Sequence, residues 1–388
     1  MKYVVCVPDG CADEPQPALG GRTPLEAADM PTLRRLAARA EVGRAAVIPP
    51  GLPAGSDVGN MSILGYDPVR YHTGRAPIEA AALGLRLPPD QVAYRCNLVT
   101  ISDDGVMVDF AGGHPATSEA AEMILAVDAR LGSGAGAELS FHPGVQYRHV
   151  MVAPREWSAA GCTPPHDLAD RVVTWPTGPA APKLQAVMDA SRPIVSGFGR
   201  DANQLWLWGQ GFQPDMPAFR DVHGVDAALC TAVDLVRGLG VLTGIEVVEV
   251  AGATGWLDTA YENKRDAALA TLAAGADLFL IHVEATDEAS HAGDLDAKVE
   301  ALEAWDRRIL AGLVDGLESM GPWRLLLLPD HPTPVRLKTH TAEAVPYLLA
   351  DSRADLGGGL YSESATMRAV TVPGAQLMSR LLEGSHHA

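Results

Sequence analysis

Paired cysteines are missing from this sequence. Its five cysteines are an odd number and form no Cys-x-x-Cys pair, so neither a disulfide framework nor a redox pair is expected. They are best explained as reduced thiols of a cytoplasmic protein. A catalytic cysteine is the alternative explanation.

Basic residues are scarce relative to acidic ones. The chain has 30 lysines and arginines against 48 aspartates and glutamates, and a formal net charge of −18. Binding to nucleic acid needs a basic footprint, so nucleic acid is not an expected partner. An anionic substrate would also be repelled overall, unless bound metal ions and a few arginines or lysines reverse the field locally.

Long apolar runs are absent as well. No stretch approaches the roughly 18 apolar residues of a membrane span, and the first apolar run stops at Asp9. This run is too short for the core of a signal peptide and is better explained as a first strand. We therefore expect a soluble, cytoplasmic protein with no membrane contact, and a monomer.

The 388 residues, 47% of them hydrophobic, exceed what one compact core usually holds, so two domains are expected. Strand-like runs alternate with helix-like runs, which predicts an α/β fold with a mostly parallel sheet flanked by helices. Strands are expected at residues 4–7, 42–48, 245–250, 277–283 and 324–329. Helices are expected at residues 31–40, 56–64, 263–274 and 295–317.

The middle of the chain has a different pattern. Residues 87–214 contain short alternating segments, many prolines and scattered aromatic residues, which predicts a smaller inserted α+β domain. The expected organisation is a core of residues 1–86 and 215–388 interrupted by this insertion. The closing residues 384–388 are set aside as a terminal tail in the search for metal ligands.

Polar residues that could carry chemistry follow the predicted strands. They are Asp9, Asp330 and His331 at strand ends, Ser56 at a helix start, Asp287 and His291 at helical i, i+4 spacing, and His340. Single residues also have structural explanations: Asp9 could cap the turn at Gly10, Ser56 could cap its helix, and Asp330 could cap a strand-end turn. Asp287 and His291 could be a solvated surface pair, and His340 is the least specific of the set on its own. Since open α/β sheets bind ligands at the carboxyl ends of their strands, we expect them to form one site.

The donor types indicate the chemistry. Carboxylates mixed with imidazoles suit two divalent cations, Mn²⁺ or Zn²⁺ more than Mg²⁺. A hydroxyl among them indicates a nucleophile activated by metal. The predicted reaction class is phosphoryl or sulfuryl transfer with Ser56 as the nucleophile.

Several motifs resemble a known family over almost the whole chain. The order Asp, Ser, Asp-x-x-x-His, Asp-His and His is similar to the alkaline phosphatase superfamily. Within it the chain resembles the archaeal type of cofactor-independent phosphoglycerate mutases and their bacterial relatives labelled as proposed homoserine kinases. The matching stretches include residues 20–28, 55–60, 64–68, 95–98, 147–149, 163–167, 252–255, 287–293 and 330–334.

This resemblance implies an alkaline-phosphatase-like core, with the inserted domain as a lid that keeps water from a phosphoserine intermediate. It implies one cation bound by Asp287, His291 and His340, and a second bound by Asp9, Asp330, His331 and the Ser56 oxygen. The implied reaction is the 2,3-bisphosphoglycerate-independent interconversion of 3- and 2-phosphoglycerate, a small phosphorylated hydroxy acid.

A mutase must also hold the substrate's carboxylate and phosphate. Arg95 and Arg148 are the candidates within the insertion, because guanidinium groups bind such anions bidentately. Lys264 resembles the family's phosphate-binding lysine of the core. His166 and Asp167 are the candidates for proton transfer.

Other functions stay open. The same family chemistry could transfer phosphate to another hydroxy compound, as in a homoserine kinase, although no GxxxxGK[ST] nucleotide motif is present. It could also end in a phosphatase or phosphonate hydrolase if the lid admits water. A metal-stabilised binding protein without catalysis is the alternative of another class.

Overall fold

The chain divides into two compact units. The computed structural model describes residues 1–132 and 138–384. The larger unit consists of Met1–Tyr71 and Met216–Ala388, and the smaller one is the continuous segment His72–Asp215. Of the terminal tail set aside above, residues 385–388 lie outside the described residues.

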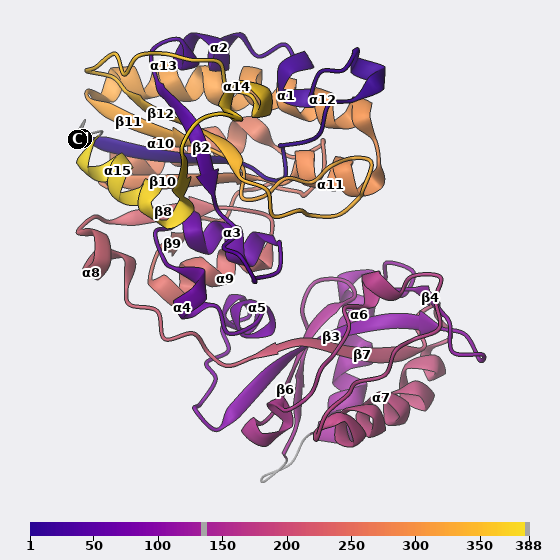
Figure 1. The fold of residues 1–388 in the computed structure, drawn as a ribbon. Helices are drawn as coiled ribbons and strands as arrows, with labels where there is room; N and C mark the ends of the chain where they lie inside the picture. Colours follow the sequence, from indigo (N-terminus) through magenta and orange to yellow (C-terminus); the bar gives the residue numbers. More distant parts are fainter. Residues whose placement is uncertain (133–137, 385–388) are drawn as a thin grey trace. The chain divides into compact units, whose positions relative to one another are not determined.

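A mostly parallel sheet forms the centre of the larger unit (Figure 1). In spatial order its strands are β13 (Thr371–Pro373), β2 (Glu41–Ala46), β12 (Val345–Asp351), β11 (Trp323–Leu327), β1 (Lys2–Pro8), β10 (Leu278–Val283), β8 (Ala227–Cys230) and β9 (Glu246–Val247). The strands from β11 to β9 are parallel, whereas β12 runs antiparallel to both of its neighbours. The predicted α/β class is confirmed.

Helices cover the sheet because its strands are apolar on both sides. Alternate residues such as Val4 and Cys6 pack against a core that includes residues of α2, α10, α12 and α13, while α3 and α9 contact each other and α15 contacts β11. The helices of this unit are α1 (Pro24–Ala27), α2 (Pro31–Ala37), α3 (Ser56–Ile63), α4 (Pro68–Tyr71), α8 (Phe219–His223), α9 (Asp234–Thr243), α10 (Tyr261–Ala274), α11 (Ala285–Ala292), α12 (Leu295–Trp305), α13 (Ala311–Met320), α14 (Glu363–Thr366) and α15 (Leu377–Glu383).

The smaller unit is an antiparallel sheet with its own core. Its central strand β3 (Gln91–Ile101) pairs with β6 (Arg148–Pro154), β7 (Gln204–Gly211) and β4 (Met107–Asp109), and β5 (Ser140–His142) pairs with β6. Its helices are α5 (Ala76–Ala82), α6 (Thr117–Val127) and α7 (Ala181–Val195). This is an α+β arrangement.

The elements follow the expected order, with three differences. The smaller unit begins at His72 rather than at residue 87, because α5 contacts β3, β6 and β7 of that unit. The strand expected at 245–250 is only the short β9. The helix expected at 295–317 is present as α12 and α13, joined by one π-helical turn at Asp306–Leu310. Among the described helices, none has the length and apolar character needed to cross a membrane.

Candidate active site

The polar residues converge at the carboxyl ends of three adjacent strands. β1 lies between β10 and β11 in the sheet, and Pro8 pairs with Val283, so Asp9 and Glu284 leave neighbouring strands at the same level. The segment after β11 carries Asp330 and His331 to the same edge. Side chains that are hundreds of residues apart in sequence thus meet because parallel strands end together.

One cluster contains Asp287, His291 and His340. The carboxylate of Asp287 lies 3.1 Å from His291 Nε2 and 3.5 Å from His340 Nε2, and the two Nε2 atoms are 2.9 Å apart. Asp287 and His291 lie one turn apart on α11, as their spacing predicted. His340 reaches them from the loop that precedes β12.

A second cluster contains Asp9, Asp330 and His331, all buried. His331 Nε2 is 3.5 Å from Asp9 Oδ1 and 3.6 Å from Asp330 Oδ2. The hydroxyl of Ser56 lies 3.2 Å from the same Nε2 atom. The structure therefore brings together all seven residues that the sequence indicated as metal ligands.

Helix α3 places Ser56 at its first position. Gly55 precedes it with an extended backbone, and the side chain of Asn60 donates to both the Ser56 carbonyl (2.9 Å) and Asp330 Oδ2 (2.7 Å). Gly59 allows this close approach, because a Cβ atom there would lie 2.1 Å from the Asp330 carbonyl oxygen. The nucleophile candidate is thus fixed against the strand-end loop.

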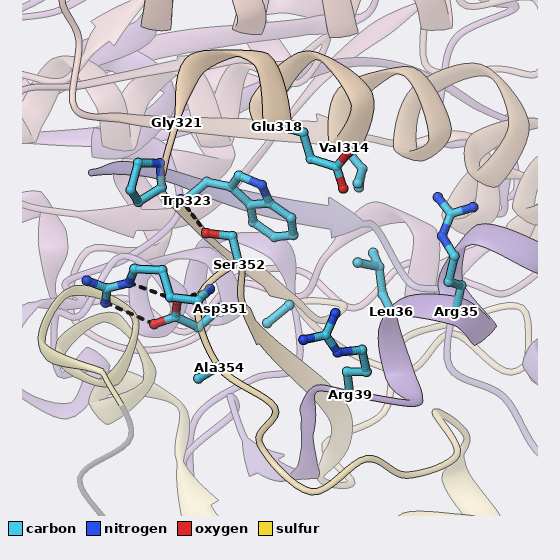
Figure 2. A pocket seen from close by; sticks show the side chains of 13 residues that line it. Arg35, Leu36, Arg39, Val314, Glu318, Gly321, Trp323, Asp351, Ser352 and Ala354 are labelled. Carbon is cyan, nitrogen blue, oxygen red and sulfur yellow. Dashed lines mark hydrogen bonds and ion pairs between the residues drawn. The ribbon is translucent and has the colours of Figure 1, made fainter.

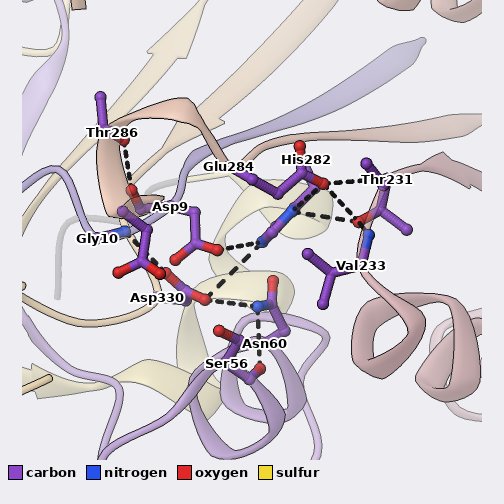
Figure 3. Close-up of polar contacts among 12 residues, drawn as sticks. Asp9, Gly10, Ser56, Asn60, Thr231, Val233, His282, Glu284, Thr286 and Asp330 are labelled. Carbon is purple, nitrogen blue, oxygen red and sulfur yellow. Dashed lines mark hydrogen bonds and ion pairs between the residues drawn. The ribbon is translucent and has the colours of Figure 1, made fainter. Parts of the chain in front are cut away.

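Sequence reasoning missed a buried layer beneath these residues, drawn in Figure 3. His282, within β10, lies 3.5 Å from Asp9 Oδ2 through Nε2 and 3.1 Å from Glu284 Oε1 through Nδ1. Thr231 donates to Glu284 Oε1 over 2.9 Å. The available signal was a histidine and a glutamate two positions apart at the end of an apolar strand, because such groups need buried partners.

Lys264 has a different position from the expected one. It was expected to bind a substrate phosphate, but its side chain is fully buried and its Nζ donates to Glu284 Oε2 (2.7 Å) and to the His282 carbonyl (2.8 Å). A buried lysine committed to a carboxylate and a carbonyl supports the layer under the site.

The electrostatics show that the buried carboxylates need positive charge. Burial raises the pKa of Asp9 well above its usual value, and the charges of Asp330 and Asp287 raise it further. Burial opposes ionisation of Asp287 too, but its contacts with His291 and His340 hold its pKa well below the usual range. Burial lowers the pKa of His331 to about 4, so this imidazole is neutral and can act as a ligand.

These residues fit divalent cations. Three groups, Asp287 with His291 and His340, Asp9 with Asp287 and His331, and Asp9 with His282 and Asp330, each present ligand atoms within 4.8 Å of one another. Among the described residues, Asp9 Oδ1 and His282 Nε2 are buried without a hydrogen-bond partner. Carboxylate oxygens and imidazole nitrogens that are buried without hydrogen-bond partners are the pattern expected of a cation site.

The other predicted substrate residues belong to the smaller unit. Arg95 is buried, and its Nε lies 2.9 Å from Glu79 Oε2. Arg148 begins β6, and its guanidinium stacks 5.2 Å from the Tyr147 ring centre. His166 and Asp167 lie in a short 3-10 helix, Pro165–Leu168, 3.7 Å apart and partly exposed.

A surface pocket elsewhere in the larger unit does not contain these residues (Figure 2). Trp323, at the first position of β11, and Arg35 and Arg39, in or after α2, contribute to its walls. It therefore lies at the amino end of β11, opposite to the edge that carries Asp330. Its position separates it from the clustered carboxylates and histidines.

Known proteins resemble the chain along most of its length. A family model described as 2,3-bisphosphoglycerate-independent phosphoglycerate mutase matches residues 37–197. The protein of that name from Methanothrix thermoacetophila is 44% identical over 365 residues, 91% of each chain, and that from Methanosarcina barkeri is 45% identical over 362 residues, 89% of each chain.

Solved structures agree. A protein from Pyrococcus horikoshii superposes with a TM-score of 0.79 at 26% identity, covering 100% of this chain and 98% of that one. A cofactor-independent phosphoglycerate mutase from Thermoplasma acidophilum has a TM-score of 0.63 at 26% identity, with 99% of each chain covered. On the sequence identity and coverage of these relatives, the chain belongs to the family of 2,3-bisphosphoglycerate-independent phosphoglycerate mutases.

Proposed function

We propose that this protein interconverts 3-phosphoglycerate and 2-phosphoglycerate through a phosphorylated Ser56, with two divalent cations. The observation that carries this proposal is the buried Ser56 hydroxyl, 3.2 Å from His331 Nε2 at the start of α3. The family relationship supplies the substrate. No free 2,3-bisphosphoglycerate is needed, because the serine itself stores the phosphoryl group.

The chain's residues perform the positioning. Asn60 fixes the backbone of Ser56 to Asp330, so the residue is held beside the cluster that its hydroxyl contacts. The helix N-terminus favours negative charge at this position. In-line attack on a bound phosphoryl group is then mainly a matter of alignment.

Each of the two cations would be bound by its own set of ligands. Asp287, His291 and His340 would hold one, and the set of Asp9, Ser56, Asp330 and His331 would hold the other. When bound, the cations lower the pKa of the serine hydroxyl and offset the charge of the transferred phosphoryl group. Imidazole-rich ligation favours Mn²⁺ or Zn²⁺ over Mg²⁺.

The smaller unit supplies the remaining requirements in this proposal. Arg95 and Arg148 bind the carboxylate and phosphate of glycerate phosphates, and His166 and Asp167 move protons at the substrate hydroxyls. The unit excludes water as a lid, which keeps the phosphoserine from hydrolysis. We propose a monomeric, cytoplasmic enzyme.

The test is a coupled assay with 3-phosphoglycerate, Mn²⁺ and enolase, without 2,3-bisphosphoglycerate. We expect product that disappears with chelator and with Ser56→Ala. Ser62→Ala is the matched control, since Ser62 lies in the same helix and donates to the Val47 carbonyl away from the cluster. Full activity of Ser56→Ala refutes the proposal.

A cation-loaded enzyme that forms no 2-phosphoglycerate would also refute the proposed reaction. It would leave phosphoryl transfer with another acceptor to be examined. ATP with homoserine, and the release of phosphate from simple esters, are then the assays to run.

A further inference from the structure

His282 is a buried histidine to which the proposed reaction assigns no role. It lies in β10, is fully buried, and pairs with Val7 of β1. Its ring projects toward the strand-end cluster, with Asp9 and Asp330 on one side and Glu284 on the other (Figure 3). It therefore lies next to Asp9 and Asp330, and Asp330 accepts from the Asn60 side chain that also donates to the Ser56 carbonyl.

Its tautomer is fixed by Glu284. The Nδ1 atom is 3.1 Å from Glu284 Oε1, and an ionised carboxylate can only accept, so Nδ1 carries a hydrogen. Glu284 is itself held by the Lys264 ammonium (2.7 Å) and by the backbone N–H of Ala232 (2.6 Å). Burial opposes ionisation of this carboxyl, but the charge of Lys264 keeps its pKa well below the usual range.

The other ring nitrogen faces two carboxylates. Nε2 is 3.5 Å from Asp9 Oδ2 and 3.8 Å from Asp330 Oδ2. Both distances exceed the range of an N–H···O hydrogen bond, which is about 2.7 to 3.2 Å. Because carboxylates face both ring nitrogens, positive charge is needed at Nε2, and either a proton or a bound cation can supply it.

The 3.5 Å distance to Asp9 fits a shared cation, and the 3.8 Å distance to Asp330 is slightly longer than the fitting range. With metal–ligand bonds of about 2.0 to 2.2 Å, the ligand atoms of a tetrahedral site are about 3.3 to 3.6 Å apart. The contacts of His331 Nε2 with Asp9 and Asp330, at 3.5 and 3.6 Å, have this spacing too. His282 thus repeats the geometry of a residue already expected to bind metal.

In two of the histidines expected to bind metal, as in His282, the Nδ1 atom contacts a hydrogen-bond acceptor. His291 Nδ1 lies 2.9 Å from the Lys338 carbonyl, and His331 Nδ1 lies 3.1 Å from Thr333 Oγ1. Thr333 donates its own hydrogen to Asp287, so it accepts from His331. In each case Nδ1 is the donor and Nε2 points into the cluster, as is typical of histidine ligands.

We propose that His282 Nε2 is a ligand of the cation bound by Asp9 and Asp330, and that Glu284 and Lys264 orient it. This adds a residue to the ligand set that the family resemblance implies. It also gives Lys264 a function as a positioning residue, which acts on the cation through Glu284 and His282. The inference rests on the cation sites of the proposed function, but not on its substrate.

Diffraction from crystals of the wild-type protein soaked with Mn²⁺ gives the direct test. Anomalous scattering should place a cation about 2.0 to 2.2 Å from His282 Nε2 and in contact with Asp9 and Asp330. A cation that contacts both aspartates but lies more than about 3 Å from this nitrogen refutes the proposal. This measurement does not depend on how any variant folds.

Calorimetric titration with Mn²⁺ gives the energetic test. His282→Gln should lower the affinity for one of the two cations at least about 100-fold. Glu284→Gln should lower the affinity for the same cation about 10- to 100-fold. His223→Gln is the control, because that histidine contacts the Leu64 carbonyl in the same unit away from the cluster. Wild-type affinity for both cations in folded His282→Gln refutes the inference.

Failure of this inference and failure of the proposed function are distinguishable. A wild-type enzyme whose cation contacts His282 but which does not form 2-phosphoglycerate supports the ligand and refutes the reaction. An active mutase whose cation lies away from His282 supports the reaction and refutes the ligand.

Discussion

Replacement of Gly59 by alanine tests how closely α3 must approach the strand-end loop. The added Cβ would lie 2.1 Å from the Asp330 carbonyl oxygen and 2.8 Å from its Cβ, whereas real Cβ contacts are essentially never shorter than 3.0 Å. Both of those atoms belong to a buried segment that also carries His331. Helix and loop must therefore separate by about 0.9 Å, the difference between 2.1 and 3.0 Å.

This separation should reduce activity more than stability. It would stretch the Asn60–Asp330 hydrogen bond, now 2.7 Å, and the 3.2 Å contact between Ser56 and His331. A displacement of about 1 Å can cost about 100-fold in rate. Overpacking costs about 1–3 kcal/mol, and the better helix propensity of alanine offsets about 1 kcal/mol of that.

The assay is kcat of the mutase reaction, together with urea unfolding, for Gly59→Ala. Gly197→Ala is the matched control, since a Cβ at Gly197 meets nothing within 4 Å. We expect a loss of about 100-fold in kcat with a modest loss of stability. A Gly59→Ala enzyme within twofold of wild-type kcat would show that the alignment of Ser56 does not depend on this contact.

Three further results are expected. Chelation should lower the melting temperature, since a cation at 100 times its Kd adds about 2.7 kcal/mol to stability. Added Mn²⁺ should restore the melting temperature, and an unchanged Tm would contradict the proposed cation sites. Lys264→Met should cost about 3–5 kcal/mol in urea unfolding because it leaves Glu284 buried and unpaired, and Lys264→Met with Glu284→Leu should recover much of this loss. Burial lowers the pKa of His149 to about 3, so the unfolded chain takes up a proton below its ordinary pKa of about 6.5 while the folded protein does not. Stability should thus be full above that pH and fall toward pH 3, by at most about 1.4 kcal/mol per pH unit. His149→Gln should lose less stability than wild type between about pH 7 and about pH 5.5, and equal losses would contradict the assigned burial.

Much of the site could be predicted because its ligands stand where strands end. Asp9 and Asp330 follow apolar runs, and Asp287 and His291 have helical spacing, so pattern and topology together brought them to one edge. The parallel core was predictable for the same reason, since its strands are continuous apolar runs.

The partners of other side chains could not be predicted, because they depend on tertiary structure. His282 lies inside an apolar run, and only the neighbouring strand shows that its Nε2 meets Asp9. Lys264 was expected to face substrate, but its burial against Glu284 is not encoded in its local sequence. The boundary at His72 escaped prediction because α5 belongs with the smaller unit through contacts with distant strands.

The central position of β1 has a consequence for synthesis of the chain. β1 ends at Pro8, but one of its two partners begins at Leu278 and the other at Trp323. At about 5–20 residues per second, the ribosome takes about 15 to 60 seconds to make the stretch in between. During this time the apolar first strand has emerged without its neighbours, whereas the segment His72–Asp215 can already fold as a continuous piece. The nascent chain thus exposes an unpaired apolar strand while another domain of it is already folded. Chaperones recognise intermediates of this kind.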